Sequence, residues 1–393
     1  MPLSRLAGVS GRPGPDPAGE RAAPGGGGWP GWDRWVAGEL DTIRDSGRWR
    51  DLRPLEGSGP RFVTPDGRAV VSFASNDYLG LAGHPAVVDA VREAARRWGA
   101  GSGSSRLIVG DRPVHHDLER ALAEWKEEPA ALVFPSGYQA NVAVMTTFGS
   151  GARIVSDELN HASIIDGARL ARAEIAVYPH GDVERAEALM ASAPGRVVVV
   201  SDTVFSMDGD VAPVGELSTA CARHGALLVL DDAHAVLPVP AADPDAACLR
   251  VGTLSKALGS QGGYVSGPAA WMELLVNRGR SFIFTTGLAP VAAAASLAAL
   301  GVWRSAEGAD LCRRLRDHVE ALRPGHPSPI VPVVLGPEEA ALEGAARLLE
   351  RGILVPAIRP PTVPVGSSRL RVSLSAAHHP EDVRRLAAAL SRL

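Results

Sequence analysis

The fold class is decided by the segment VVVVSDTVFSMDGDVAPVGELSTACARHGALLVLDDAH, which runs from Val197 to His234. Two apolar runs, Val197–Ser201 and Leu227–Asp231, flank a stretch with helical character, Val214–His224. Both runs are apolar throughout, which is typical of strands buried on both faces of a parallel sheet. A strand, a helix and a second strand in this order predict a right-handed crossover unit of an α/β domain.

The same alternation extends along the chain in both directions. Further strands are predicted at Ala131–Phe134, Arg153–Ser156 and Ile175–Tyr178, with a helix at Asp182–Ala191. From about Val291 the pattern changes to that of a smaller α+β domain. Its predicted elements are a long helix, a strand at Ile330–Leu335, a helix near Pro337–Arg351, a strand at Arg369–Ser375 and a final helix that begins at Pro380.

These patterns divide the chain into four parts. Residues 1–33 contain GRPGPDP and PGGGGWPG, and this Gly/Pro-rich tail has too little apolar surface to offset the entropy of ordering. We therefore predict a disordered tail over 1–33 and an N-terminal arm over 34–75. A large mainly parallel-sheet domain follows over 76–290, and the C-terminal α+β domain covers 291–393.

Composition excludes several classes of function. Lys and Arg number 40 and Asp and Glu 44, so the formal net charge of −4 argues against nucleic-acid binding and against a polybasic membrane protein. The apolar segment Gly287–Trp303 contains Pro290 and Ser296 and is mostly alanine, which favours a buried helix over a membrane span.

The three cysteines, Cys221, Cys248 and Cys312, are far apart and provide neither a disulfide framework nor a CxxC metal site. The N-terminus has no continuous apolar run like that of a signal peptide. We expect a reduced, cytoplasmic protein.

Polar residues follow the predicted strands, where ligands of open α/β sheets lie. The segments after the strands are Pro135–Tyr138, Asp157 with Asn160 and His161, Ser201–Asp210, and Asp231–His234, with GTLSKALG (Gly252–Gly259) further along. A site for pyridoxal phosphate requires a lysine for the Schiff base, a carboxylate for the pyridine nitrogen, a flat side chain to cover the ring, and amides at a helix N-terminus for the phosphate.

Lys256 and Asp231 fit the two central roles in such a site. Lys256 lies in a loop of small residues and would form the Schiff base. Asp231 ends a buried strand and would keep the pyridine nitrogen protonated. Taken alone, Asp231 is also compatible with a helix N-cap and Lys256 with a surface lysine. Their occurrence together and in this order favours the cofactor site.

Two other motifs are interpreted differently. The Gly-rich segment Gly99–Arg106 follows a helical pattern, Pro85–Trp98, whereas a dinucleotide-binding loop must follow a strand, so a Rossmann site is not predicted. The pairs His115–His116 and His378–His379 lack further ligands at metal spacing, and no metal is expected.

Several motifs in register resemble the α-oxoamine synthase family, pyridoxal-phosphate enzymes with the fold-type I aminotransferase architecture. The resemblance covers about Trp35 to Leu393. It is carried by SNDYLGL (Ser75–Leu81), GSGSSR (Gly101–Arg106), SGYQAN (Ser136–Asn141), NHAS (Asn160–Ser163), FSMDGD (Phe205–Asp210), DDAH (Asp231–His234), GTLSKALG (Gly252–Gly259) and FIFTTGLAP (Phe282–Pro290).

The resemblance implies a role for each matched position. The catalytic residues would be Lys256, His161, which stacks on the cofactor ring, Asp231 and His234. Ser206 would hydrogen-bond the phenolic oxygen of the ring together with His234. The phosphate would be bound by the amides of Gly137 and Tyr138 and the hydroxyl of Thr253, with Thr285 or Thr286 reaching the phosphate of a neighbouring subunit. Arg371 would bind the amino-acid carboxylate, Arg50 the acyl substrate, and Thr362 would line the acyl pocket.

Within the family, the stretch Ala357–Pro364, followed by Arg369–Arg371, is most similar to the branch that joins L-alanine to a pimeloyl thioester in biotin synthesis. The resemblance implies decarboxylative condensation, with the thioester on coenzyme A or on an acyl carrier protein. It also implies a homodimer with shared active sites.

Three departures from the family pattern bear on the substrate. The family usually continues the histidine motif as His-Gly-x-Gly, whereas Ala235–Pro238 follow His234 here. The segment before Lys256 is shorter, and Ser104 stands where glycine is common. Two alternatives therefore stay open. One is a sister enzyme that uses glycine, serine or another acyl thioester, and the other is a cofactor-binding protein without catalysis.

Overall fold

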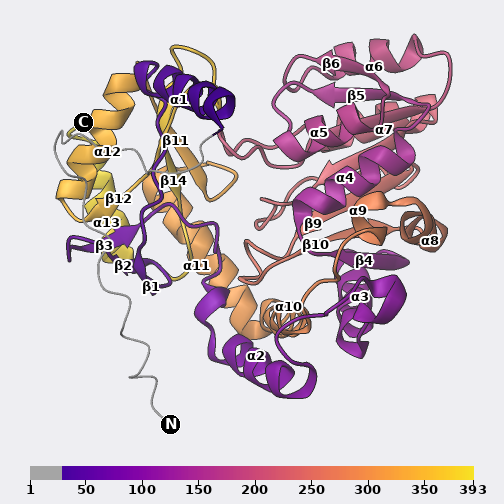
Figure 1. Cartoon of the computed structure of the whole chain (residues 1–393), viewed down its shortest axis with the longest axis horizontal. Coiled ribbons are helices and arrows are strands. Elements are labelled where there is room, and N and C mark those ends of the chain that lie inside the picture. Colours follow the sequence, from indigo (N-terminus) through magenta and orange to yellow (C-terminus); the bar gives the residue numbers. More distant parts are fainter. Residues whose placement is uncertain (1–28) are drawn as a thin grey trace. The chain divides into compact units, whose positions relative to one another are not determined.

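The computed structural model describes residues 29–393, which divide into a first unit, 29–53, and a second unit, Pro54–Leu393 (Figure 1). The described part of the first unit contains helix α1 (Pro30–Asp45), which starts with Pro30 and carries Asp33 in its first turn, as suits the helix dipole. Of the disordered tail predicted over 1–33, residues 1–28 lie outside the described residues. Its last residues, from Pro30 on, are helical and not disordered.

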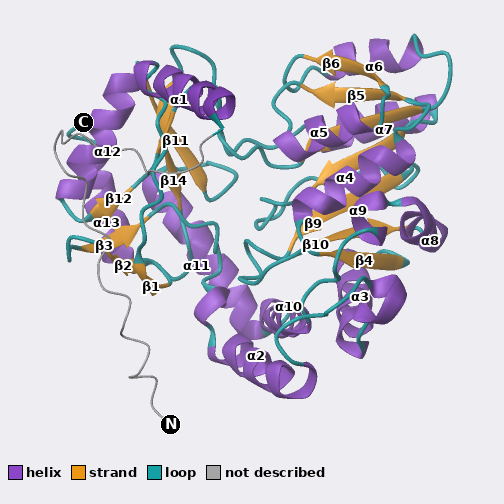
Figure 2. Ribbon diagram, viewed as in Figure 1, coloured by secondary structure: helices purple, strands orange, loops and turns teal. Residues whose placement is uncertain are grey.

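The second unit is built on a seven-stranded sheet of order β4-β10-β9-β8-β7-β5-β6 (Figure 2). The strands β5 to β9 pair in parallel, and β10 pairs antiparallel with both β4 and β9. The predicted mainly parallel sheet is therefore confirmed. The bounds are β4 Ala130–Phe134, β5 Arg153–Asp157, β6 Glu174–Tyr178, β7 Val197–Asp202, β8 Leu227–Asp231, β9 Cys248–Thr253 and β10 Gly263–Gly267.

Both faces of this sheet are covered, which explains why its strands are apolar throughout. In β7, Val198 and Val200 pack in one cluster with residues of α4, α5 and α8, while Val197 and Val199 pack in another with residues of α6 and α7. The helices around the sheet are α2 Pro85–Trp98, α3 Pro113–Lys126, α4 Gly137–Phe148, α5 Ala162–Leu170, α6 Val183–Ala191, α7 Val214–His224, α8 Ala269–Arg278 and α9 Arg280–Ile283.

Two strands of the seven-stranded sheet, β9 and β10, are absent from the sequence prediction. Arg250 interrupts the apolar run of β9, and β10 begins and ends with glycine. Arg250 is tolerated inside the sheet because its guanidinium pairs with the buried Asp232, with nitrogen and oxygen 3.2 Å apart. Gly252 is required by packing, since a Cβ there would lie 2.3 Å from the ring of Tyr264. Both features weaken the local strand pattern for reasons that only the tertiary structure shows.

The remaining strands form two smaller sheets. In the first sheet, β12 pairs in parallel with β3, and this pairing joins residues near position 70 to the C-terminal segment. In the second sheet, β14 lies between β11 and β13. The bounds are β1 Glu56–Ser58, β2 Arg61–Val63, β3 Ala69–Ser72, β11 Ile330–Gly336, β12 Ile353–Leu354, β13 Ala357–Ile358 and β14 Ser368–Ser373. The helices are α10 Pro290–Trp303, α11 Ala306–Leu322, α12 Glu338–Glu350 and α13 Pro380–Leu390, with single turns η1 Leu81–Gly83 and η2 Arg106–Gly110.

The Gly-rich segment after Trp98 follows helix α2 and not a strand, as predicted. Within residues 29–393, no helix is long and apolar enough to cross a membrane.

Candidate active site

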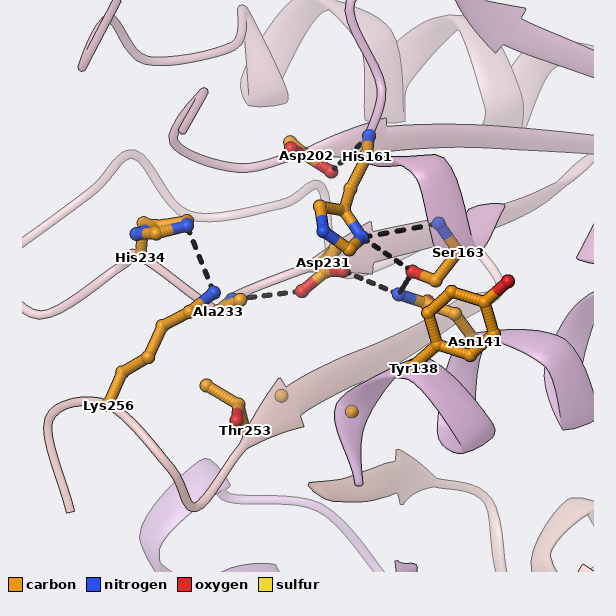
Figure 3. Close-up of a pocket in the computed structure, with 12 residues that line it drawn as sticks. Tyr138, Asn141, His161, Ser163, Asp202, Asp231, Ala233, His234, Thr253 and Lys256 are labelled. Carbon is orange, nitrogen blue, oxygen red and sulfur yellow. Dashed lines mark hydrogen bonds between the residues drawn. The ribbon is translucent and has the colours of Figure 1, made fainter. Parts of the chain in front are cut away.

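A cavity of about 200 Å³ lies where β7, β8 and β9 end and α4 begins (Figure 3). It brings together most of the residues predicted for the cofactor. Its lining is Gly137, Tyr138, Asn141, His161, Ser163, Asp202, Asp231, Ala233, His234, Gly252, Thr253 and Lys256.

The N-terminus of α4 forms one wall of the cavity. Ser136 caps this helix, because its Oγ accepts the amide N–H of Gln139 at 3.2 Å. The amides of Gly137 and Tyr138 have no acceptor among the described residues, so they are free to bind an anion at the positive end of the helix dipole. Gly263 allows this turn to approach, since a Cβ there would lie 2.5 Å from the backbone of Gly137.

The hydroxyl of Thr253 lies at the end of β9, in the same cavity. It donates to the carbonyl of Gly262 at 3.1 Å and accepts the amide of Ser255 at 3.1 Å. These contacts hold the loop that carries Lys256 next to the end of the strand.

Lys256 reaches into the cavity and places Nζ 3.0 Å from Nε2 of His234 (Figure 3). Burial lowers the pKa of Lys256, against the opposing charges of Asp231 and Asp202. A lysine with a lowered pKa supplies more neutral amine near pH 7, which is the form that acts as nucleophile or base.

Asp231 lies at the end of β8 and is 6% exposed. Its Oδ2 accepts a hydrogen bond from Asn141 Nδ2 at 2.6 Å, and its Oδ1 accepts the amide of Ala233 at 2.9 Å. Both contacts fix the carboxylate in the cavity wall (Figure 3). The Oδ1 atom of Asn141 is buried and has no partner in the described structure.

His161 precedes α5 and presents its ring to the same cavity. Its Nδ1 accepts from the amide of Ser163 at 3.2 Å and lies 2.7 Å from the hydroxyl of that serine, which in turn accepts from Asn141 at 2.9 Å. Burial lowers the pKa of His161, so the ring is neutral near pH 7. A neutral, oriented imidazole suits stacking on an aromatic cofactor.

His234 is 5% exposed and lies between two polar partners. Its Nε2 faces Lys256, and its Nδ1 lies 2.6 Å from the hydroxyl of Tyr78. Burial, together with the charges of Lys256 and Arg371, keeps the pKa of His234 well below its ordinary value.

Arg371 is buried in β14 and belongs to the same network. Its Nη1 and Nη2 each lie 3.3 Å from Oδ1 of Asn76, its Nε donates to the carbonyl of Ser206, and its Nη1 donates to Ser373 at 2.7 Å. Ser206 thus touches Arg371 through its backbone, in the FSMDGD loop after β7. The neighbouring Arg369 pairs with Asp208 of the same loop.

Six predicted site residues lie outside the cavity lining, namely Ser206, Arg371, Thr285, Thr286, Thr362 and Arg50. Thr285 Oγ1 accepts from Gln139 at 3.3 Å, and Thr286 and Thr362 are exposed. Arg50 is exposed and lies in the first unit. The roles of these six residues, like the roles of the residues that line the cavity, stay predictions.

Six residues of the network have no role predicted from the sequence: Asn76, Tyr78, Asn141, Ser163, Asp202 and Ser373. Asn141 stands four positions after Gly137 in α4, on the same helix face, so the helical period could have indicated it. Asp202 pairs in register with Asp231 across β7 and β8. Burial and the charge of Asp231 raise the pKa of Asp202 well above its usual value.

Three of the four histidines in the two pairs have backbone partners, and His116 contacts the carboxylate of Asp111. His115 lies 2.8 Å from the carbonyl of Leu288, and His378 lies 2.9 Å from that of Ser72. His379 caps α13 through the amide of Glu381. The described residues contain no group of side chains able to hold a metal ion.

The chemistry of the cavity fits pyridoxal phosphate. The free amides of Gly137 and Tyr138 suit the phosphate, and Asp231 suits the pyridine nitrogen. Lys256 suits the aldehyde, and Asn141, which lines the cavity, has a buried Oδ1 without a hydrogen-bond partner in the described structure.

Residues 68–390 match the family model of class I and II aminotransferases. The chain therefore belongs to this family of proteins.

Two named relatives define a more specific family. The chain is 45% identical over 385 residues to an 8-amino-7-oxononanoate synthase of Geobacter sulfurreducens, which covers 92% of this chain and 98% of that protein. It is 48% identical over 377 residues to a protein of the same name from Burkholderia mallei, with 89% and 95% covered. The chain belongs to the 8-amino-7-oxononanoate synthase family.

Solved structures agree with the fold. A serine palmitoyltransferase from S. paucimobilis, with a bound aldimine of PLP and myriocin, superposes with a TM-score of 0.85 at 28% identity, covering 92% of this chain and 97% of that one. An 8-amino-7-oxononanoate synthase from Francisella tularensis superposes with a TM-score of 0.69 at 24% identity, covering 82% and 97%. The fold-type I architecture expected from the sequence is confirmed.

Proposed function

We propose that this chain condenses L-alanine with a pimeloyl thioester, releasing carbon dioxide and free thiol and forming 8-amino-7-oxononanoate for biotin synthesis. The observation that carries the proposal is the convergence of Lys256, Asp231, His161 and His234 on one cavity beside a free helix N-terminus. The named relatives, 45% and 48% identical, support the choice of reaction.

Pyridoxal phosphate, when bound, supplies a protonated pyridine ring that withdraws electrons from the α-carbon of the amino acid. Asp231 would stabilise the proton on the pyridine nitrogen, because its carboxylate is buried and held by two hydrogen bonds. Asn141 orients that carboxylate. His161 would stack on the ring, and Gly137, Tyr138 and Thr253 would hold the phosphate.

Lys256 moves the α-proton of the amino acid. Its lowered pKa makes the amine a base near neutrality, and its contact with His234 directs Nζ into the cavity. Arg371 binds the carboxylate of the amino acid. Its guanidinium is already oriented by Asn76, Ser206 and Ser373, so little conformational freedom is lost when the substrate binds.

The homodimer predicted from the family resemblance fits an exposed apolar surface. Leu107, Ile108 and Val109 of η2 are 50%, 74% and 67% exposed, and Phe284 is 70% exposed. The two segments are adjacent, because the amide of Gly287 donates to the carbonyl of Ser104 at 2.9 Å. Apolar side chains on neighbouring segments favour burial against a second copy, which would bring Thr285 or Thr286 to the partner's phosphate.

The test is a panel of substrates offered to the purified, cofactor-loaded protein. L-alanine, glycine, serine and threonine are each paired with pimeloyl and longer acyl thioesters, on coenzyme A and on acyl carrier protein, and released thiol is measured. Fastest release with L-alanine and a pimeloyl thioester is expected. Faster release with glycine or serine would assign the chain to a sister reaction, and no release with any pair would favour a protein that binds the cofactor without catalysis.

A further inference from the structure

A buried tyrosine outside the cavity lining contacts the histidine that faces the catalytic lysine. Tyr78 lies in the SNDYLGL segment before η1 and is fully buried. We propose that Tyr78 is a positioning residue, whose hydroxyl holds the imidazole of His234 toward Lys256 whichever nitrogen of the ring carries the proton. This inference rests on the proposed function, since His234 acts on a bound cofactor.

The contact is close. The hydroxyl of Tyr78 lies 2.6 Å from Nδ1 of His234 and 3.1 Å from Oδ1 of Asn76. The two rings meet edge to face, with centroids 6.0 Å apart. Burial raises the pKa of Tyr78 to about 12, so the phenol keeps its proton at neutral pH.

A neutral imidazole has one N–H and one lone pair, so the partner of Nδ1 depends on what Nε2 does. When Nε2 accepts a hydrogen bond from Lys256, Nδ1 carries the proton and donates it to Tyr78, whose own O–H points to Asn76. When Nε2 carries the proton and donates to an oxygen in the cavity, Nδ1 accepts from the hydroxyl of Tyr78. A hydroxyl serves both arrangements because it rotates.

Asn76 supplies a fixed acceptor for the first arrangement. Both terminal nitrogens of Arg371 donate to its Oδ1, which fixes that oxygen on the side facing Tyr78. The backbone is held as well, because the carbonyl of Tyr78 accepts the amide of Ala376 at 2.8 Å. The hydroxyl therefore lies between an anchored acceptor and the ring of His234. In a phenylalanine variant, the buried Nδ1 would lose its partner.

The proton affinity around Lys256 is set by several groups that face it. Burial lowers the pKa of Lys256, the charges of Asp231 and Asp202 raise it, and that of Arg371 lowers it, while the rings of His234 and His161 lie close by. A change in the orientation of His234 alters the hydrogen bond to Nζ and hence the proton affinity at this position. The effect is visible in the absorbance of a cofactor joined to this nitrogen.

The test compares Tyr78→Phe with a matched control, Tyr264→Phe. Tyr264 is also buried, but its hydroxyl faces Lys126 outside the cavity. Each protein is loaded with pyridoxal phosphate, and the visible absorbance is titrated with pH beside a thermal melting curve. Tyr78→Phe is expected to shift the pH midpoint by about 0.5 unit or more, equivalent to about a 3-fold change in proton affinity. Tyr264→Phe is expected to leave the midpoint unchanged. An unchanged midpoint in Tyr78→Phe contradicts the inference.

A double-mutant cycle tests whether Tyr78 acts through His234. In the His234→Asn background, Tyr78→Phe is expected to cause no further shift, and a full additional shift would overturn the proposal.

A second variant, 3-fluorotyrosine at position 78, keeps the ring and hydroxyl while strengthening the phenol as a donor. It is expected to move the midpoint without lowering the melting temperature, and an unmoved midpoint argues against the role. Failure of the unmodified protein to bind the cofactor would refute the proposed function itself, separately from this inference.

Discussion

Replacing Asp231 with asparagine removes the negative charge that we propose at the cofactor nitrogen, while almost preserving the shape of the side chain. Both neighbours of the carboxylate are donors, Asn141 Nδ2 at 2.6 Å and the amide of Ala233 at 2.9 Å. An amide has only one oxygen, so one of these donors must face an NH₂ group. The lost charged hydrogen bond costs about 1.5–3 kcal/mol. The lost negative charge slows formation of the carbanion by about 10²-fold, equivalent to about 2.7 kcal/mol in the activation barrier.

The assay is exchange of the α-proton of L-alanine in D₂O, followed by NMR on cofactor-loaded protein without thioester. The matched control is Asp232→Asn, because Asp232 is the adjacent buried carboxylate but pairs with Lys126 at 2.9 Å and with Arg250, away from the cavity. The control is expected to lower the melting temperature, as breaking a buried ion pair does, with little effect on exchange per folded protein. Normal exchange in Asp231→Asn, or loss of exchange only in Asp232→Asn, would refute the assignment.

Two further predictions concern binding and stability. Arg371→Lys is expected to weaken L-alanine binding by about 1.5–3 kcal/mol, since a lysine offers a point charge in place of two parallel donors. The KM for the thioester is expected to stay the same. Equal losses for both substrates with a lower melting temperature would indicate that Arg371 is a structural ion-pair residue instead. Hydrogen bonds to Asp157 and Asp210 raise the pKa of His180 from 6.5 to about 10, so its contribution to stability is complete below pH 6.5 and is lost as the pH rises through about 10. Urea unfolding at several pH values should show this decline in the free energy of unfolding, and the decline should be smaller in His180→Gln. An identical pH dependence in the variant would count against the pairing of His180 with Asp157 and Asp210.

The main strands of the sheet could be predicted from the sequence because burial on both faces leaves a continuous apolar run. Val197–Asp202 and Leu227–Asp231 show this signal clearly. Strand β9 does not, because Arg250 is stabilised by Asp232, which belongs to the turn after β8. The N-terminal helix was missed for a different reason. Its first residue, Pro30, follows a glycine-rich stretch whose composition favours disorder, whereas proline at the first helical position also starts helices.

The central residues of the site were predictable because their type and order match one chemistry. Lys256 and Asp231 lie at strand ends or just after them, where the topology of an α/β sheet gathers ligand-binding groups. The supporting contacts depend on pairs that are distant in sequence. Arg371 and Asn76 are 295 positions apart, and Tyr78 and His234 are 156 apart. No local pattern reports such pairs, so the role of Tyr78 emerges only from the structure.

The most direct test of Lys256 as the residue that binds pyridoxal phosphate uses the small number of lysines in the chain. The sequence contains only two lysines, Lys126 and Lys256, and Lys126 is engaged in an ion pair with Asp232. The protein loaded with pyridoxal phosphate is reduced with borohydride, digested and mapped by mass spectrometry. We expect a yellow protein whose phosphopyridoxyl label is found on Lys256, and no label at that position in Lys256→Ala. A colourless protein, or a label on Lys126 with Lys256 unmodified, would contradict this role of Lys256.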